Sequence, residues 1–428
     1  MIIHPRRYNI ALLGSLVWLV IVILLYYYVH RPITPAFMSA FGGALVDSAS
    51  TLLFVIIAGG VGRTIRHRIF DLSALSIPEQ IAIDALGGFG ILALFILIIG
   101  AVNLSMISIA LLLLVIGIVT YRHIWSWIQD IQQWIHSWHF DTTWKRGLAL
   151  FIGINLALGW LMALLPPTAF DTLTYHLVGP KLWVAEGRFV HLPHNHFFAF
   201  PALLHTLYSG QMALLLGRIT AAATLQLAIT LLGLCGLVGY ASRRFSRNAG
   251  MFCTAVFLSG TSFWLLLSWA YVDLVVMAFA AISFIAIDEW RANRYENMQW
   301  LTLAAIFVGF TLSNKYNAFA WAVIMGLYIL NYRWRTGWKA SIKDSFLYAV
   351  IVIIVLSPWL MRNIMMYSNP IYPFGPPTGE WDELSNQFYF PDNREFLEER
   401  WWFIAFMPLT ATFLGVGGTG LFDLTIGP

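Results

Sequence analysis

The sequence predicts an all-α, polytopic transmembrane fold with about 11–12 spans. Charged residues make up 11% and apolar residues 59% of the 428 residues, and the mean hydropathy is +0.73. A soluble globular domain carries about 25% charged residues, so the composition indicates an integral membrane protein. The 19 Trp and 17 Tyr suit the interfacial belts of such proteins. The basic residues stand in short loops between apolar runs, a pattern that sets membrane orientation rather than nucleic-acid binding.

Four apolar runs near the N-terminus are each long enough to cross a bilayer, because a span needs about 20 mostly apolar residues. If the N-terminus is cytoplasmic, the basic residues within 63–68 and at 145–146 return to the cytoplasm, as the positive-inside rule requires. We therefore predict a four-span N-terminal module over residues 1–121. Its spans are expected near 8–29, 39–61, 81–101 and 103–121.

Residues 122–146, RHIWSWIQDIQQWIHSWHFDTTWKR, show a different pattern. Trp and Ile recur at helical spacing, while Gln, Asp and His occupy the other face. Such a pattern is typical of an amphipathic helix in a membrane surface. We expect an interfacial helix on the inner surface that joins two membrane modules, and a partner-binding helix is the alternative.

The second module, residues 147–428, is expected to begin with a span over 147–165 that delivers Asp171 to the outer face. Segment 200–218 is ambiguous, since counting it as a span would place the arginines at 243–247 outside. His205 and Gln211 also make it a poor span, so we expect a juxtamembrane helix on the outer surface, within the first large outer loop. Later spans are expected near 219–241, 249–269, 272–290, 299–313, 316–332 and 345–361.

Three further features of the chain give weaker signals. The last stretch, 401–428, is interrupted by Pro and Gly and ends at FDLTIGP without a cytoplasmic segment, which leaves open a module truncated at its C-terminus. Cys235 and Cys253 lie inside apolar runs and are interpreted as core residues. The histidines of HLPHNHFF lack the i, i+4 spacing of a helical metal site, so hydrogen-bonding roles are favoured, and a divalent metal stays an open alternative.

The predicted topology collects polar side chains at one depth on the outer face. Any single charge at a bilayer edge is as easily a snorkelling anchor. Carboxylates have short stems, however, so Asp171 and Asp273 fit the anchor interpretation poorly; Asp47 and Asp84, in the first module, are interpreted as structural. The candidate set is Asp171, Tyr175, His176, Lys181, His194 and His196 in the first large outer loop, and Asp273, Lys315, Tyr316 and Arg362 at later hairpins.

Carboxylates and cations at the water–lipid boundary suit the transfer of a group from a lipid phosphate. The lipid tail stays in the leaflet while its phosphate lies at headgroup depth. Lys or Arg would stabilise charge that develops on the leaving phosphate, and a carboxylate would take the proton of an incoming hydroxyl.

Four segments, FDTLTYHLVGPKLWVAEGRF, SWAYVDL, GFTLSNKYNAF and PWLMRN…NPIYPF, resemble in order and spacing the GT-C superfamily of polyprenyl-phosphate-sugar glycosyltransferases. The nearest groups are the protein O-mannosyltransferases and the lipid A aminoarabinose transferases. The resemblance covers residues 147–428, and the first-loop motif departs from the family in having a single Asp followed by Thr172. It implies a GT-C-like catalytic module that follows a four-span addition.

The resemblance also implies an activity and roles for residues. A sugar would move from a polyprenyl-phosphate donor to a hydroxyl of a lipid, glycan or protein acceptor on the extracytoplasmic face of the plasma (inner) membrane. Asp171 and Asp273 match the two catalytic acids, and Lys315 and Arg362 match the donor-phosphate ligands. Tyr175, His176, Lys181, His194, His196 and Tyr316 would line the substrate site.

Two other function classes remain open from the sequence. A transporter or lipid flippase would place polar groups near the midplane, on broken helices related by internal repeats, and no repeat is visible here. A non-catalytic membrane scaffold would leave the charges at four separate hairpins without an explanation. A continuous polar path through the bilayer would favour transport, and a one-sided site would favour the transferase.

Overall fold

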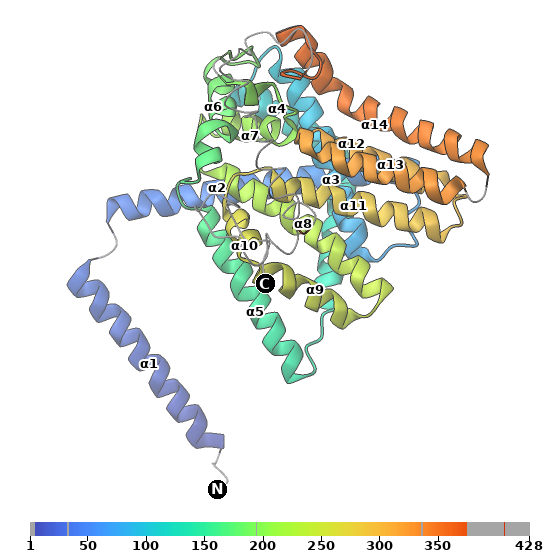
Figure 1. Ribbon diagram of the computed structural model, residues 1–428. Coiled ribbons are helices and arrows are strands. Elements are labelled where there is room, and N and C mark those ends of the chain that lie inside the picture. Colours follow the sequence, from blue (N-terminus) through green and yellow to red (C-terminus); the bar gives the residue numbers. More distant parts are fainter. Residues whose placement is uncertain (1–4, 32–33, 194, 335–336, 375–405, 407–428) are drawn as a thin grey trace. The chain divides into compact units, whose positions relative to one another are not determined.

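A computed structural model describes residues 5–31, 34–193, 195–334, 337–374 and 406, and every regular element in these ranges is a helix (Figure 1). The elements are α1 (Pro5–His30), α2 (Pro35–Ile69), α3 (Ile77–Gly100), α4 (Met106–His136), α5 (Thr143–Ala163), η1 (Thr172–His176), α6 (Val178–Ala185), η2 (His196–Ala199), α7 (Leu203–Leu214), α8 (Ala221–Arg244), α9 (Arg247–Ser259), α10 (Thr261–Ser268), α11 (Asp273–Ala292), α12 (Met298–Leu312), η3 (Tyr316–Ala318), α13 (Phe319–Trp334) and α14 (Trp338–Tyr367).

Within the described residues, seven helices are long and apolar enough to cross a membrane, or eight if the bent pair α9 and α10 forms one span. The expectation of a helical, multi-pass membrane protein is therefore confirmed. The expected number of spans was higher because it included α11, α12 and α13. Of these, α12 has only 15 residues, and α11 carries Asp288 and Glu289 within its length. The seven are Leu13–His30 of α1, and α2, α3, α4, α5, α8 and α14.

The chain divides into two compact units, residues 1–49 and 50–428. The first unit holds α1 and the first part of α2. In α1, residues Leu13–His30 have a mean hydropathy of 2.0, which suits a helix surrounded by lipid. The boundary between the units falls within α2, and the four-span module over residues 1–121 stays a prediction.

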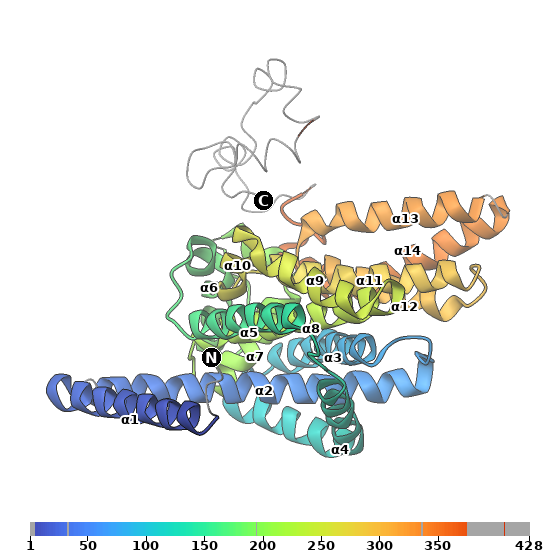
Figure 2. The same cartoon turned by 90° about the horizontal axis from the view of Figure 1, so that it is seen from below.

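The core of the second unit is a series of neighbouring helices (Figure 2): α3 packs on α8, α8 on α11, α11 on α12, and α12 on α14. Small residues let these helices approach closely, as is common where lipid removes the hydrophobic drive between helices. A Cβ on Gly233 of α8 would lie 2.5 Å from the Cβ of Ala278 on α11. The helices α8 and α11 run in parallel, because Gly236 likewise meets Ile282 one turn further along both.

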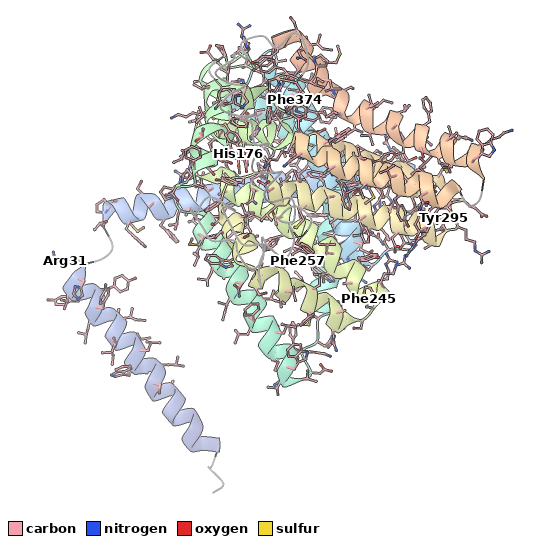
Figure 3. The ribbon with its side chains drawn as sticks, in the orientation of Figure 1. Arg31, His176, Phe245, Phe257, Tyr295 and Phe374 are labelled. Carbon is pink, nitrogen blue, oxygen red and sulfur yellow. The ribbon has the colours of Figure 1, made fainter. Side chains whose placement is uncertain are left out.

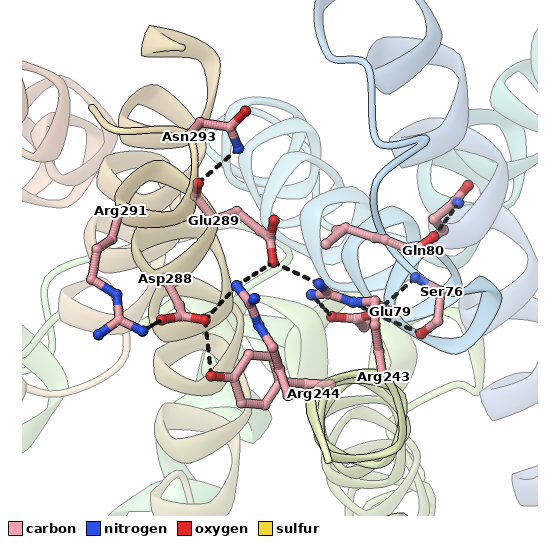
Figure 4. A network of polar contacts seen from close by, with 11 residues as sticks. Ser76, Glu79, Gln80, Arg243, Arg244, Asp288, Glu289, Arg291 and Asn293 are labelled. Atoms are coloured by element: carbon pink, nitrogen blue, oxygen red, sulfur yellow. Dashed lines mark hydrogen bonds and ion pairs between the residues drawn. The ribbon is translucent and has the colours of Figure 1, made fainter. Parts of the chain in front are cut away.

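Where α8 and α11 end, their charged side chains form an ionic network with the start of α3 (Figure 4). Arg243 binds Glu79 and Glu289, each at 2.7 Å, and Arg244 continues the network to Asp288 at 2.7 Å. With Arg291 on Asp288, three cations balance three carboxylates. Buried charges persist only when they are paired, so we interpret this network as a structural clamp.

A second charged group lies close to the start of α3. Asp84 is buried and accepts two hydrogen bonds from Arg66, at 2.6 and 3.1 Å, and Arg63 bonds Asp130 of α4 at 2.5 Å. The expectation that Asp84 has a structural partner is therefore confirmed. We call this group and the network of Figure 4 together the ionic layer.

Two predicted surface helices differ in the structure. Residues 122–136 are not a helix of their own but the continuation of α4. Their apolar stripe packs on protein: the indole of Trp127 is 1% exposed, donates to the carbonyl of Ile81, and fills the space beside Gly59.

Segment 200–218 contains α7, whose 12 residues span only about 18 Å, too little for a membrane crossing, as expected. It does not lie on a surface, however. Nearly every residue of α7 is buried. The amide of Gln211 donates to the hydroxyls of Ser50 and Thr51, both at 3.0 Å. The polar residues that make α7 a poor span thus find partners inside the bundle.

Candidate functional site

Asp171 stands at the start of an unusual helical turn. After α5 ends, residues Thr172–His176 form a π-helical turn, closed by a bond of 3.0 Å from the Leu177 N–H to the Thr172 carbonyl. Such turns are rare and frequent at functional sites. The turn places Tyr175 beside Asp171, and its hydroxyl donates to Oδ2 of Asp171 at 2.8 Å. One carboxylate oxygen of Asp171 is thereby held in a fixed orientation.

Tyr271 joins this group, although nothing in the sequence singles it out beyond its place in SWAYVDL. It lies between α10 and α11, and its phenol oxygen accepts a hydrogen bond of 3.2 Å from the backbone N–H of Asp171. Because Tyr271 comes two residues before Asp273, this bond ties the Asp171 turn to the loop that carries the second predicted acid.

Asp273 and Lys315 form an ion pair, with Nζ 2.7 Å from Oδ1. Asp273 opens α11, where a carboxylate is favoured by the helix dipole, and Lys315 follows α12. The side chains are 39% and 29% exposed, so water screens the pair and its contribution to stability is about 0–1 kcal/mol. This pair differs in that respect from the buried pairs of the ionic layer.

A pair of buried histidines lies beneath the two acids. Nδ1 of His176 is 2.7 Å from Nε2 of His205 on α7, and the His176 ring also contacts Tyr271, with centroids 5.2 Å apart. Burial lowers the pKa of His205 to about 3, with the charges of Arg362 and Lys315 acting in the same direction. Burial likewise lowers the pKa of His176 well below its usual value, and the charges of His205 and Lys315 lower it further. Both rings are therefore neutral near pH 7.

The charged residues that the sequence predicts for the site shift the pKa values of the same neighbouring side chains. Burial is the main reason why the pKa of Tyr175 is raised. The hydrogen bond to Asp171 and the charges of Asp171 and Asp273 raise it further. For Tyr271, burial raises the pKa most, the hydrogen bond from the N–H of Asp171 lowers it, and the charges of Asp171 and Asp273 both raise it. Two carboxylates thus influence the same tyrosines, while Lys315 and Arg362 both influence His205. The electrostatic influence of all four charges therefore reaches this group of tyrosines and histidines. We call Asp171, Tyr175, His176, His205, Tyr271, Asp273 and Lys315 the acidic site.

Arg362 is present in this neighbourhood but is engaged by protein. It is 7% exposed, and its Nη2 donates to the carbonyls of Ala199 and Phe200, both at 2.8 Å. Asn363 adds a bond of 2.7 Å to Ala199 and a bond of 3.3 Å to the hydroxyl of Tyr316. The sequence did not single out Asn363, and these two residues of α14 fix the turn that leads into α7.

The other predicted lining residues are dispersed. Lys181 is exposed on α6 and borders a separate hollow with Leu104, Ser105 and Gly217. His196 contacts Phe197, with centroids 4.1 Å apart, and burial lowers its pKa to about 4. Phe197 in turn stacks on Tyr175 at 4.4 Å. His194 lies outside the described residues.

The acidic site lies away from the ionic layer. In Figure 3, the labels of His176 and Tyr295 mark opposite ends of the bundle, and Tyr295 follows α11. On α11 itself, Asp273 and Asp288 are 15 residues apart, or about 22 Å along the helix. Among the side chains that the structure describes, no group of three or more His, Cys, Asp or Glu is arranged to hold a metal ion.

The protein-family model described as "Domain of unknown function (DUF8201)" matches residues 48–379. The chain belongs to this family. No curated protein matches the chain, and no solved structure matches it either. The matched range contains the whole acidic site and the ionic layer, so both are parts of the DUF8201 domain.

Proposed function

We propose that this DUF8201 member is a glycosyltransferase that moves a sugar from a polyprenyl-phosphate donor to an acceptor hydroxyl at the extracytoplasmic face of the plasma (inner) membrane. The observation that carries the proposal is that Asp171 is bonded to Tyr175 and to Tyr271, and Tyr271 stands two residues before the Asp273 of the Asp273–Lys315 ion pair. It joins a proton acceptor and a cation at one end of a membrane-spanning bundle. The order of motifs that resembles the GT-C superfamily supplies the substrate class.

In the proposed reaction, Asp171 accepts the proton of the acceptor hydroxyl while that oxygen attacks the anomeric carbon. The bond between this carbon and the phosphate oxygen breaks, and its electron pair stays on the phosphate. Lys315 stabilises the negative charge that develops there. Tyr175 holds Oδ2 of Asp171, so that Oδ1 faces the acceptor, and Asp273 positions Lys315. A divalent metal is not needed for these steps to balance.

The placement of buried polar residues supports a one-sided site better than a transport path. Below the histidines, polar side chains continue along α7 to Gln211 and to the pair Thr51 and Thr224, whose hydroxyls are 2.7 Å apart. The next inward residues of α2 are apolar and buried, beginning with Phe54 and Ile57. Further inward on α8, the side chains of Gln226 and Thr230 are fully buried and bonded to each other, whereas a transporter would line an open path with polar groups across this level.

The test is turnover by the full chain in lipid nanodiscs, supplied with a panel of polyprenyl-phosphate sugars and assayed for released polyprenyl phosphate. We expect Asp171→Asn to lower the rate by at least about a hundredfold, since general-base catalysis contributes about 10²–10⁴-fold. Asp141→Asn is the matched control, because Asp141 is an exposed carboxylate paired with Lys145 at 2.7 Å. Full activity of a folded Asp171→Asn protein would refute the assignment of the base.

A further inference from the structure

A large apolar groove runs along the side of the bundle between α2, α4, α5, α8 and α9. Its volume is about 490 Å³, within the range of small-molecule sites, roughly 300–1,000 Å³. Its walls are almost wholly apolar and include Val55, Trp160, Leu231 and Met251. A groove of this lining in a membrane protein fits a hydrocarbon chain.

The groove does not end in apolar surface. A second hollow of about 350 Å³ shares Trp134, Trp138 and Val238 with it. Besides apolar residues, the lining of this second hollow includes polar and charged ones, among them Ser242, Arg243 and Arg247. The two hollows therefore adjoin, one almost wholly apolar and the other bordered by arginines, as the two parts of an amphiphile require. We call the two adjoining hollows together the channel.

The two arginines are not equivalent. Arg243 is neutralised by Glu79 and Glu289 in the ionic layer. Arg247 forms no ion pair with any carboxylate in the described part of the chain. Its Nη2 donates to the carbonyl and the hydroxyl of Ser137. The exposed guanidinium therefore borders the hollow with a charge that no described carboxylate pairs with, and a phosphodiester is a suitable partner for it.

We propose that this channel is a binding site for one anionic glycerophospholipid, with an acyl chain in the groove and the headgroup phosphate on Arg247. The charge of Arg247 decides for an anionic headgroup over a zwitterionic one. The indoles of Trp134 and Trp138, with ring centroids 5.6 Å apart, border both hollows, and Trp is enriched at membrane–water interfaces. The lipid would wedge between the end of α4 and the start of α9. This site is separate from the acidic site and does not depend on the activity proposed for it.

The experiment is native mass spectrometry of the full chain, released from detergent after incubation with phosphatidylglycerol or with phosphatidylcholine of the same acyl chains. We expect one phosphatidylglycerol to be retained, on the order of tenfold more strongly than phosphatidylcholine. Arg247→Gln is expected to remove this preference, because the charge-assisted bond to the phosphate is lost. Gly153→Leu is expected to lower retention of both lipids, since Gly153 lines the groove.

The controls separate lipid binding from folding. A Cβ on Gly153 meets no atom within 4 Å, and the same is true of Gly147 on the same helix, which is not among the groove residues. Gly147→Leu and the surface change Lys343→Gln should therefore bind as the unaltered chain does. Equal retention of the two lipids, or unaltered phosphatidylglycerol binding by both Arg247→Gln and Gly153→Leu, would overturn the proposal.

Discussion

Removal of a carboxylate should mainly lower stability in the ionic layer, whereas in the acidic site it should mainly lower activity. Asp84→Asn and Asp273→Asn are the same chemical change, each near the start of a long helix that packs in the core. The two positions differ in their surroundings. The Asp84 side chain is 0% exposed and bonded twice by Arg66, whereas the Asp273 side chain is 39% exposed and meets one lysine.

The magnitudes follow from that difference. Asp84→Asn leaves Arg66 charged, buried and without its counter-ion, a change that costs about 3–5 kcal/mol in free energy of unfolding. Asp273→Asn frees Lys315 to turn toward water, so the cost is less than about 1 kcal/mol. Under the proposed function, Asp273→Asn should nevertheless lower the rate of sugar transfer, because Lys315 loses the partner that positions it.

Thermal unfolding in detergent measures the stability difference, with a thiol-reactive dye as the reporter. The chain has two cysteines, and in a Cys253→Ala background only Cys235 can react. Cys235 is 9% exposed and bonds the carbonyl of Pro78, so it becomes reactive when α3 and α8 separate. We expect Asp84→Asn to label at a clearly lower temperature than Asp273→Asn. If Asp273→Asn proved the more destabilising, Asp273 would be structural and the division between the two sites would be wrong.

Two further predictions concern the core. Gly88→Ala should destabilise strongly, because its Cβ would lie 1.8 Å from the Ala58 carbonyl oxygen, where ordinary contact begins at 3.4 Å. Gly87→Ala, which meets only Phe307 at 3.7 Å, should be neutral or stabilising by up to about 1 kcal/mol; equal melting temperatures would contradict the close approach of α2 and α3. The second prediction is a loss of stability as the pH falls from about 6.5 toward 3. The pKa of His205 is depressed to about 3 in the fold, so protonation favours the unfolded chain. The melting temperature should therefore depend less on pH across this range for His205→Gln than for the unaltered chain. An equal pH dependence of the two would exclude His205 as the cause.

Much of the helical framework could be predicted from the sequence, because hydropathy depends on composition within a short window. The spans expected at 219–241 and 345–361 correspond to α8 and α14. The same method fails for residues 122–136, since an amphipathic stripe looks alike whether it faces lipid headgroups or the glycines of another helix. Trp127 of α4 fits beside Gly59 of α2, and this contact between two helices depends on the tertiary structure, which a short window of sequence does not contain.

The candidate site was predicted in part for a similar reason. Charges at hairpin ends are visible in the sequence, so Asp171, Asp273 and Lys315 could be named. Their partners could not, because hydrogen bonds such as that of Asp171 to Tyr271 join residues 100 positions apart. Arg362 was expected to hold a phosphate, yet its donors bind backbone carbonyls, which no property of the isolated residue reveals.

The buried position of α7 has a consequence for biosynthesis. The first N–H groups of α7 are satisfied by the Ser313 carbonyl and the Asn314 side chain, and the turn before it by Arg362, 163 residues later. At a synthesis rate of about 5–20 residues per second, that turn waits on the order of ten to thirty seconds for its last contact. The helix α7 itself packs on α3, α4, α6 and α8, and Gln211 and His205 bond residues that are made before them. Only the turn and the first N–H groups of α7 therefore wait for the later helices.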